Sequence, residues 1–248
     1  MHKSLLKYLI LLSMFITEIL AQNSNLNVQI FGIGSIPIGE FNKKIGSSFE
    51  ITRKSGFDYG TNIGLADIGY GIGTELNIPV LINGLAWQFS TKLLFNPTDN
   101  SKITEAFNND ERIIDELIFD TGNWLNVPIM SGFSYGLKLF TGINFYVQLQ
   151  AGINISHQPE RKATYQNVLV EEVKYNDLVD FAIEPAISFD YNEIYTLSLR
   201  YINLNSPRFE GTRYINEKLF PEISTRDYKI AAEEKSIEML LITFGIKL

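Results

Sequence analysis

The sequence feature that most constrains the fold is a run of eleven residues, Phe145 to Ile155, in which apolar and other side chains alternate strictly. Successive side chains of a β-strand point to opposite faces, so the run predicts a long strand with one apolar side. The apolar face carries Phe145, Val147, Leu149, Ala151, Ile153 and Ile155. The other face carries Tyr146, Gln148, Gln150, Gly152 and Asn154.

A partner strand of similar length comes directly before this run. Its apolar residues, which share one face, are Leu125, Val127, Ile129, Phe133 and Tyr135. A short break at Leu137 to Leu139 joins the two strands, so the pattern predicts a tall β-hairpin.

The same alternation recurs along the chain and predicts eight strands in all. The expected strands cover residues 26–36, 69–80, 85–95, 125–135, 145–155, 178–189, 194–204 and 235–248. The breaks after the second, fourth and sixth strands are short. Long polar segments, which we expect to be loops, follow the first, third, fifth and seventh strands, at Glu40–Leu65, Asn96–Asn123, His157–Asp177 and Asn205–Glu234. Short turns at one end and long loops at the other are typical of an outer-membrane barrel.

Two of the short breaks have recognisable turn chemistry. Asn83-Gly84 predicts a type I′ turn, in which both central residues have positive φ. With these two residues as the turn, Glu75 lies opposite Lys92 in the neighbouring strand. A second tight turn is expected at residues 191–193.

The N-terminus has the layout of a secretory signal peptide, which we expect to cover residues 1–21. Lys3 and Lys7 precede a short apolar run, and the small residue Ala21 offers a cleavage site. Glu18 interrupts the apolar run, which is too short for the ~20 residues of a membrane-spanning helix. Residues 22–248 would then form the barrel domain.

Composition excludes two classes of protein. Removal of Lys3, Lys7 and Glu18 with the signal leaves 19 basic and 27 acidic residues, a formal charge of −8. A chain this acidic is poorly suited to nucleic acid, which needs clustered Lys and Arg. The chain has no Cys, so it is not a disulfide scaffold.

Alternation alone does not say which face of the sheet is inside. A soluble lipocalin-type barrel also has eight strands, with its apolar face pointing inward around a ligand. The strand lengths match the ~9–11 residues of a tilted membrane strand, and a closed barrel leaves no backbone group unpaired in lipid. With the signal peptide and the loop pattern, these features favour an eight-stranded antiparallel up-and-down transmembrane β-barrel.

Several motifs resemble the small outer-membrane β-barrel domain of porin-family or PorT-like proteins from Gram-negative bacteria. The segments concerned are Leu125–Ile129, Gln150–Asn154 and Ile36–Phe41. The resemblance covers essentially the whole mature chain and implies a fold and an outer-membrane location, not an activity. Such barrels often end in an aromatic residue, whereas Leu248 stands in that place here.

If lipid is outside, the polar face lines the barrel interior. An eight-stranded barrel is just wide enough for side chains to fill it, so we expect no large diffusion pore. The charged residues expected to point inward are Glu75, Lys92, Asp180, Glu184 and Arg200. They would form either a proton or ion path or a salt-bridged plug, and we favour the plug because buried charges are usually paired.

A membrane-barrel enzyme acting on lipid is the alternative from another class. It would need a nucleophile beside a base near the outer rim. His157 is the one His of the mature chain, and Ser131, Ser134 and Ser156 lie in no nucleophile motif. We therefore expect no catalytic residues, and no cofactor or metal site.

Two functions remain open at this point. The first is a structural or binding barrel whose long loops present a surface outside the cell, since loops on a rigid scaffold often carry binding. The second is a subunit of an outer-membrane secretion or assembly complex, as the PorT-like resemblance implies. The expected partners are outer-membrane lipid and envelope proteins, and not nucleic acid.

Overall fold

The computed structural model describes residues 26–42, 50–52, 56–58, 65–80, 82–100, 104, 117–216 and 228–248. The expected signal peptide lies outside the described residues. Within those ranges, no helix has the length and apolar character needed to cross a membrane. A single turn of 3-10 helix, η1 (Gly39–Asn42), follows the first strand.

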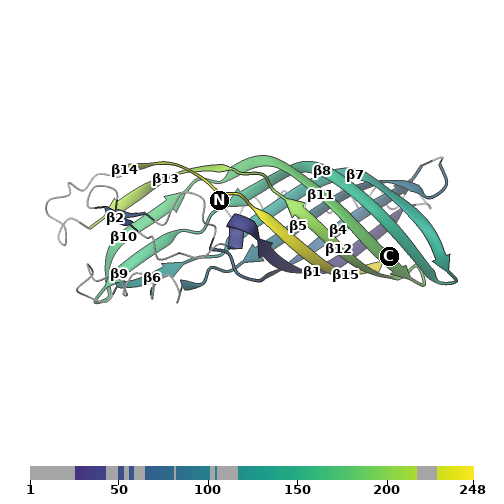
Figure 1. Ribbon diagram of the computed structural model, residues 1–248, viewed down its shortest axis with the longest axis horizontal. Coiled ribbons are helices and arrows are strands. Elements are labelled where there is room, and N and C mark those ends of the chain that lie inside the picture. Colours follow the sequence, from purple (N-terminus) through teal and green to yellow (C-terminus); the bar gives the residue numbers. More distant parts are fainter. Residues whose placement is uncertain are drawn as a thin grey trace.

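Eight antiparallel strands close into a barrel (Figure 1). They are β1 (Asn27–Ile38), β4 (Gly69–Pro79), β5 (Leu85–Asn96), β7 (Trp124–Phe140), β8 (Ile143–His157), β11 (Leu178–Tyr191), β12 (Tyr195–Asn203) and β15 (Glu238–Lys247). Each strand pairs with the barrel strand before and after it in the chain, and β1 closes the ring by pairing with β15. The predicted up-and-down barrel is therefore confirmed.

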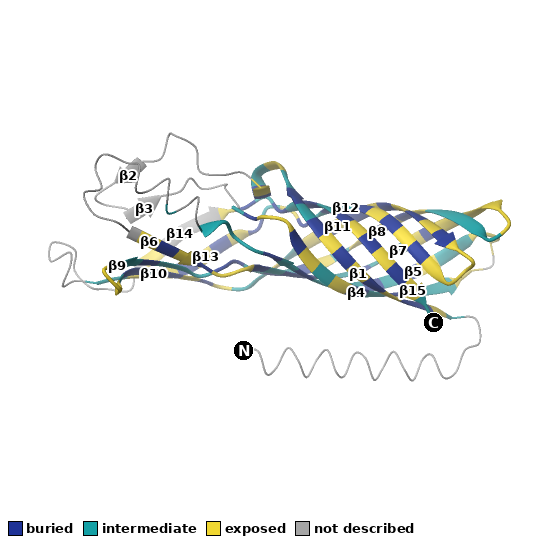
Figure 2. Ribbon diagram, turned by 90° about the horizontal axis from the view of Figure 1, so that it is seen from below, coloured by how far each residue is buried: buried dark blue, intermediate teal, exposed yellow. Residues whose placement is uncertain are grey.

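Apolar and polar side chains sort to opposite faces of the barrel wall. Along β8, Leu149 is 56% exposed while its neighbour Gln150 is 1% exposed. The same alternation gives the barrel strands in Figure 2 their banded colouring. Large apolar side chains that are exposed on the outer surface include Ile72, Phe133, Val147, Leu149, Ile153, Phe181, Ile187, Leu197, Leu199, Ile242 and Phe244. The apolar face points outward, as a membrane barrel requires and a lipocalin does not.

The three short connections lie at one end of the barrel, which we call the short-turn mouth. The first and last strands meet there, because Leu248 N donates to Val28 O at 2.8 Å. Asn192 and Glu193 have φ angles of 52° and 60°, so the tight turn predicted at residues 191–193 is present and has the positive φ values of a type I′ turn.

The turn between β4 and β5 differs from the prediction. Positive φ is found at Gly84 but, among the described residues, not at Asn83. The connection between Pro79 and Leu85 is longer than two residues, and Glu75 pairs with Ser90 instead of Lys92. The shift is two residues, which preserves the face to which every side chain points.

The turn between β7 and β8 also lies further along the chain than expected. The strands extend through the predicted break at residues 137–139 and turn at Thr141 and Gly142, after a register irregularity between Lys138 and Phe140. A strand can continue through that segment because its apolar residues, Leu137 and Leu139, are exposed on the outer surface of the barrel like the other apolar residues of this face.

Three of the four segments expected as loops instead contribute to a second sheet. β6 (Leu117–Thr121), β9 (Arg161–Tyr165), β10 (Val168–Tyr175), β13 (Arg208–Ile215) and β14 (Tyr228–Glu234) form a five-stranded sheet in the order β14-β13-β10-β9-β6. Each strand is separated by only a few residues from a barrel strand, so this external sheet extends one side of the barrel away from the short-turn mouth (Figure 1). The fourth segment contributes the small hairpin of β2 (Glu50–Thr52) and β3 (Gly56–Asp58).

The external sheet was missed because its exposed residues are a mixture of polar and apolar side chains, with Ile118, Val168 and Tyr214 among the apolar and aromatic ones. Between β9 and β10, Gln166 and Asn167 have φ angles of 47° and 62°, which is a hairpin turn without the glycine that usually marks one. Val170 and Glu171, which are adjacent on β10, are both buried, so burial does not alternate regularly along this strand. Periodicity of apolar residues therefore gave no strand signal there.

Candidate functional site in the barrel interior

Four of the five charged residues expected to point inward meet in one cluster across the barrel. Lys92 Nζ lies 3.0 Å from Glu184 Oε2, and Arg200 Nη1 lies 3.0 Å from both Glu184 Oε1 and Glu75 Oε2. All four side chains are buried. They come from β4, β5, β11 and β12, so the cluster connects strands on opposite sides of the barrel. We call these four residues the charged cluster; its two cations and two carboxylates balance.

Amide side chains hold the carboxylate of Glu75 in place. Its Oε2 accepts a hydrogen bond from Gln150 Nε2 at 3.2 Å, in addition to the ion pair with Arg200. Its Oε1 accepts from Gln88 Nε2 at 3.0 Å and from Asn77 Nδ2 at 3.2 Å. Hydrogen bonds on both oxygens replace the water that the carboxylate lost on burial.

Asp180 does not join the charged cluster. It lies on the same face of β11 as Glu184, but four residues nearer the external sheet, which corresponds to about 13 Å along a strand. Its Oδ1 accepts hydrogen bonds from Asn205 Nδ2 at 2.9 Å and from the backbone N of Phe181 at 2.7 Å. Asp180 therefore belongs to the barrel rim.

The face of the charged cluster that points toward the external sheet is covered by Phe31. The guanidinium of Arg200 lies over the Phe31 ring, 5.1 Å from its centroid. The ring fits because Gly73 has no side chain: a Cβ there would lie 2.5 Å from Phe31 Cε2. A glycine at this position makes room for an aromatic ring inside a narrow barrel.

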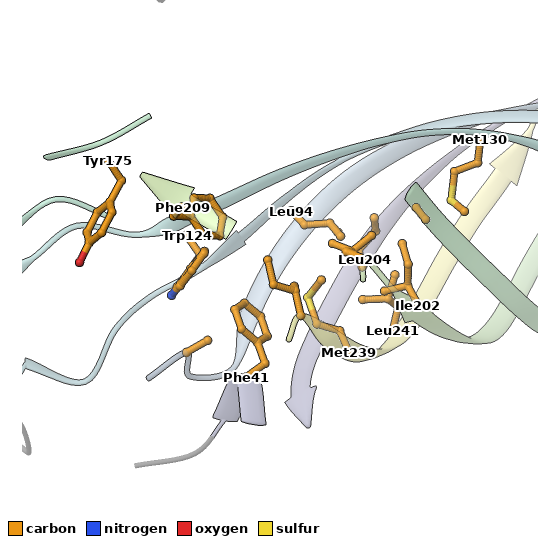
Figure 3. Close-up of a cluster of buried hydrophobic side chains, with 14 of the residues drawn as sticks. Phe41, Leu94, Trp124, Met130, Tyr175, Ile202, Leu204, Phe209, Met239 and Leu241 are labelled. Atoms are coloured by element: carbon orange, nitrogen blue, oxygen red, sulfur yellow. The ribbon is translucent and has the colours of Figure 1, made fainter. Parts of the chain in front are cut away.

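Beyond Phe31 part of the barrel interior is apolar, which corrects the expectation of a wholly polar interior; Asn126, Asn154 and Ser156 are buried there as well and are hydrogen-bonded to one another. On β12, Ile202 follows Arg200 on the inward face, and Leu204 comes next just beyond the strand. We call the buried side chains here the apolar plug: Phe31, Ile33, Leu94, Met130, Ile202, Leu204, Met239 and Leu241. Figure 3 labels Leu94, Met130, Ile202, Leu204, Met239 and Leu241. The prediction failed because strands such as β1 and β15 carry apolar side chains on both faces near this end.

Three aromatic rings continue the apolar plug into the base of the external sheet. The rings of Phe41 and Trp124 meet edge to face at 5.3 Å, and those of Trp124 and Phe209 at 5.7 Å (Figure 3). Phe41 is on η1, Trp124 begins β7, and Phe209 is on β13. Barrel and external sheet therefore share one hydrophobic core.

His157 does have an acidic partner, which the sequence reading missed. Its Nδ1 lies 2.6 Å from Asp177 Oδ1, at the junction of the barrel with the external sheet. Asp177 precedes β11 and gave no pattern that links it to His157. Ser156 is on the opposite face of β8, where its Oγ donates to Asn126 Oδ1 at 2.8 Å.

The other candidate nucleophiles also lie apart from this pair. Ser131 Oγ accepts a hydrogen bond from Trp87 Nε1 at 2.8 Å, and Ser134 is buried in the barrel interior. Within the part of the chain that the structure describes, no three His, Cys, Asp or Glu residues are grouped so that they could hold a metal ion.

The external sheet has a buried carboxylate of its own. Glu171 on β10 is buried, and its Oε1 lies 2.8 Å from Arg213 Nε on β13. Burial raises the pKa of Glu171 above its ordinary value, and it outweighs the opposite effects of Arg213 and Arg161. The folded state therefore binds this proton more tightly than the unfolded state does.

Replacement of Glu171 with Gln is expected to stabilise the external sheet at neutral pH relative to the wild type. Because folding raises the pKa of Glu171, the ionised carboxylate lowers the stability of the folded state when the pH is above the folded pKa. This loss of stability disappears as the pH falls through the folded pKa. The advantage of Glu171→Gln should therefore shrink as the pH falls through the folded pKa of Glu171. Guanidinium unfolding followed by Trp124 fluorescence in a Trp87→Phe background would measure it.

Glu172, the next residue, is the matched control. Its hydrogen bond with Lys174 is the main reason that the pKa of Glu172 is lowered. The stability that Glu172 contributes is present above its unfolded pKa and is lost as the pH falls, so Glu172→Gln should be destabilising at neutral pH. If both variants changed stability in the same direction, the burial argument for Glu171 would be wrong.

Comparison with known proteins gives structural likenesses only. No family model matches the chain, and no curated protein matches it. A major outer membrane protein from Thermus thermophilus has a TM-score of 0.49 and 7% identity, covering 90% of this chain and 99% of that one. The outer membrane protein OprG from Pseudomonas aeruginosa has a TM-score of 0.46 and 11% identity, covering 90% and 96%. The attachment invasion locus protein Ail of Yersinia pestis has a TM-score of 0.41 and 9% identity, covering 91% and 100%.

Proposed function

We propose that this chain is an integral outer-membrane protein that binds partners through its external sheet and does not serve as a diffusion pore. The observation that carries the proposal is the combination of a blocked interior and an extended wall. The charged cluster and the apolar plug fill successive levels of the barrel. The five strands of the external sheet continue beyond the barrel.

The outer surface supports insertion in a membrane. Every barrel strand has at least one large apolar side chain exposed on this surface, which together we call the apolar band, and the closed ring of strands leaves no barrel edge unpaired. Aromatic residues flank the band at both levels: Tyr191 and Tyr195 are exposed near the short-turn mouth, and Tyr70 is exposed nearer the external sheet. Aromatic side chains at both boundaries are typical of membrane barrels. The short-turn mouth would then face the periplasm.

The blocked interior leads to a first functional prediction. The purified protein, inserted in planar bilayers, is expected to give no stable large conductance steps, because the charges of the cluster are paired and the apolar plug excludes hydrated ions. A large diffusion porin inserted in the same bilayers serves as the positive control. Stable large channels from the wild-type protein would overturn the proposal.

Site-specific photocrosslinking in native membranes would test the binding role. A photoreactive residue at Tyr214, which is exposed on the external sheet, should capture envelope or extracellular proteins. The same residue at Leu149, on the lipid-facing side of β8, should capture none and is the matched control. If no protein were captured at Tyr214, the binding role would be excluded.

A third crosslinking position separates the proposal from the role that the PorT-like resemblance suggests. A subunit of a secretion or assembly complex would also contact periplasmic components, which would reach the short-turn mouth. A photoreactive residue at Asn192, in the turn between β11 and β12, would report such contacts. Adducts at Asn192 without adducts at Tyr214 would favour the secretion or assembly complex over the external binding role.

A further inference from the structure

Three Ser and Thr side chains point outward from the middle of the barrel wall, all on one side of the barrel. They are Thr74 on β4, Thr91 on β5 and Ser131 on β7, and each is next to a buried residue that points inward. These three strands are neighbours in the ring. On β8, β11, β12 and β15, by contrast, the outward positions between the strand ends carry apolar and aromatic residues only. One side of the outer surface therefore differs chemically from the rest.

Thr74 and Thr91, which we call the hydroxyl pair, lie directly opposite each other. Thr74 is the central residue of β4, and the register pairs it with Thr91. Apolar side chains surround the pair on the same face of the two strands: Ile72, Leu76, Phe89 and Leu93. In the proposed membrane location, on which the inference rests, the middle of the wall is in contact with hydrocarbon and not with water.

Neither hydroxyl of the pair has a partner in the part of the chain that the structure describes. Ser131 Oγ accepts a hydrogen bond from Trp87 Nε1 at 2.8 Å, but Thr74 and Thr91 form no side-chain hydrogen bond with each other or with other described residues. An unbonded hydroxyl in hydrocarbon is costly, and acyl chains offer neither a donor nor an acceptor. The partner that these two hydroxyls lack would therefore come from a second protein.

The wall beside the hydroxyl pair leaves room for a second barrel to approach. β1, the neighbour of β4, has glycine at two outward positions, Gly32 and Gly34, and a Cβ added at either would meet no atom closer than 3.9 Å. Burial of apolar surface contributes little to association in lipid, because acyl chains are as apolar as the protein surface. Contacts between membrane helices depend instead on small residues that allow close packing and on hydroxyls that bond across the contact, and the same forces act between barrels.

The hydroxyl pair is complementary to itself under a two-fold rotation. A threonine hydroxyl both donates and accepts a hydrogen bond. If the two-fold axis is along the membrane normal, Thr74 of one copy faces Thr91 of the partner subunit, and the same pairing recurs on the other side of the axis. An unrelated partner would need its own matched pair of polar groups at the same depth. We propose that two copies of this chain associate in the membrane through the outer faces of β4 and β5, with the hydroxyl pair at the centre of the contact.

Cysteine cross-linking of the full-length protein, folded in phosphatidylcholine vesicles, would test the contact. The chain has no Cys, so a single introduced thiol reports without background. Thr91→Cys, oxidised with copper phenanthroline, is expected to give a disulfide-linked dimer. Leu199→Cys is the matched control, because Leu199 is exposed on β12, which is diametrically opposite β5 in the ring. No dimer with Thr91→Cys, or as much dimer with Leu199→Cys, would overturn the proposal.

Flotation of the same vesicles separates the failure of the dimer from the failure of the membrane location. Protein that floats with the vesicles but gives no cross-link would contradict the dimer alone. Protein that does not float would contradict the membrane location on which the dimer depends. Heat-modifiable migration on a gel would verify that each variant is folded.

Removal of the two hydroxyls would test their role in the contact. Thr74→Val combined with Thr91→Val keeps the shape of both side chains and is expected to weaken association by about tenfold, because the two reciprocal hydrogen bonds are lost. Förster transfer between donor-labelled and acceptor-labelled copies in vesicles would measure this change. Thr164→Val combined with Thr212→Val makes the same substitution on β9 and β13 of the external sheet and should leave association as in the wild type. Unchanged association in the hydroxyl-pair variant would overturn the assignment of the contact.

Discussion

Replacement of Arg200 with Met is expected to lower the free energy of unfolding by about 3–5 kcal/mol, the cost of breaking a buried ion pair by removing one partner. Arg200 is bonded to both carboxylates of the charged cluster. Without it, Glu75 and Glu184 would face each other with only Lys92 to balance two negative charges. Urea or guanidinium titration of the protein folded in phospholipid vesicles would measure the loss.

Two further variants test whether the loss comes from unbalanced charge. Arg208 is exposed on the external sheet, where its Nε lies 3.2 Å from Glu234, so Arg208→Met should cost only about 0–1 kcal/mol. Replacing all four members of the charged cluster with neutral residues of similar volume should recover most of the stability. If this quadruple variant were as unstable as Arg200→Met, shape and not charge would explain the effect.

Replacement of Leu149 with Arg is expected to cost about 2–4 kcal/mol, the penalty for a cation on the lipid face near the middle of a membrane barrel. Leu149 lies near the centre of β8 and has its side chain on the outer surface. In a soluble protein the same change at an exposed position would be nearly neutral. Urea titration of folding into phosphatidylcholine vesicles would measure the difference.

Val168 provides the matched comparison for Leu149. It is 45% exposed, but it is on β10 of the external sheet, outside the proposed membrane region. Val168→Arg should change stability by no more than about 0.5 kcal/mol. Equal and small effects at the two positions would mean that the outer surface of the barrel is not in lipid, and would contradict the outer-membrane proposal.

The sequence was sufficient to predict the barrel because its strands have two different environments. The alternation of outward and inward side chains, as at Leu149 and Gln150, is predicted correctly even when a turn is misplaced, provided that the register shifts by an even number of residues. The register between β4 and β5 illustrates this, since Glu75 pairs with Ser90 instead of Lys92 and still points inward. Where both faces are apolar, as on β1 around Phe31, no such signal exists.

The charged cluster was only partly predictable. The sequence places Glu184 and Arg200 on adjacent strands, and they do form an ion pair at 3.0 Å. The meeting of Glu75 with Arg200 depends on the width and tilt of the closed ring, which residue periodicity does not contain. Residue periodicity also does not say at which level of the barrel a residue lies, and for that reason Asp180 was grouped with residues that it does not contact.

The seam between β1 and β15 has a consequence for the kinetics of folding. It brings together residues that are 204 positions apart, as the hydrogen bond between Ser35 and Met239 illustrates. Pairings of such long range form late, because their loop-closure entropy must be overcome before any contact compensates for it. Until the seam forms, β1 and β15 each keep an unpaired edge, which lipid tolerates poorly. Entry into the bilayer and closure of the seam should therefore occur together, as one slow step.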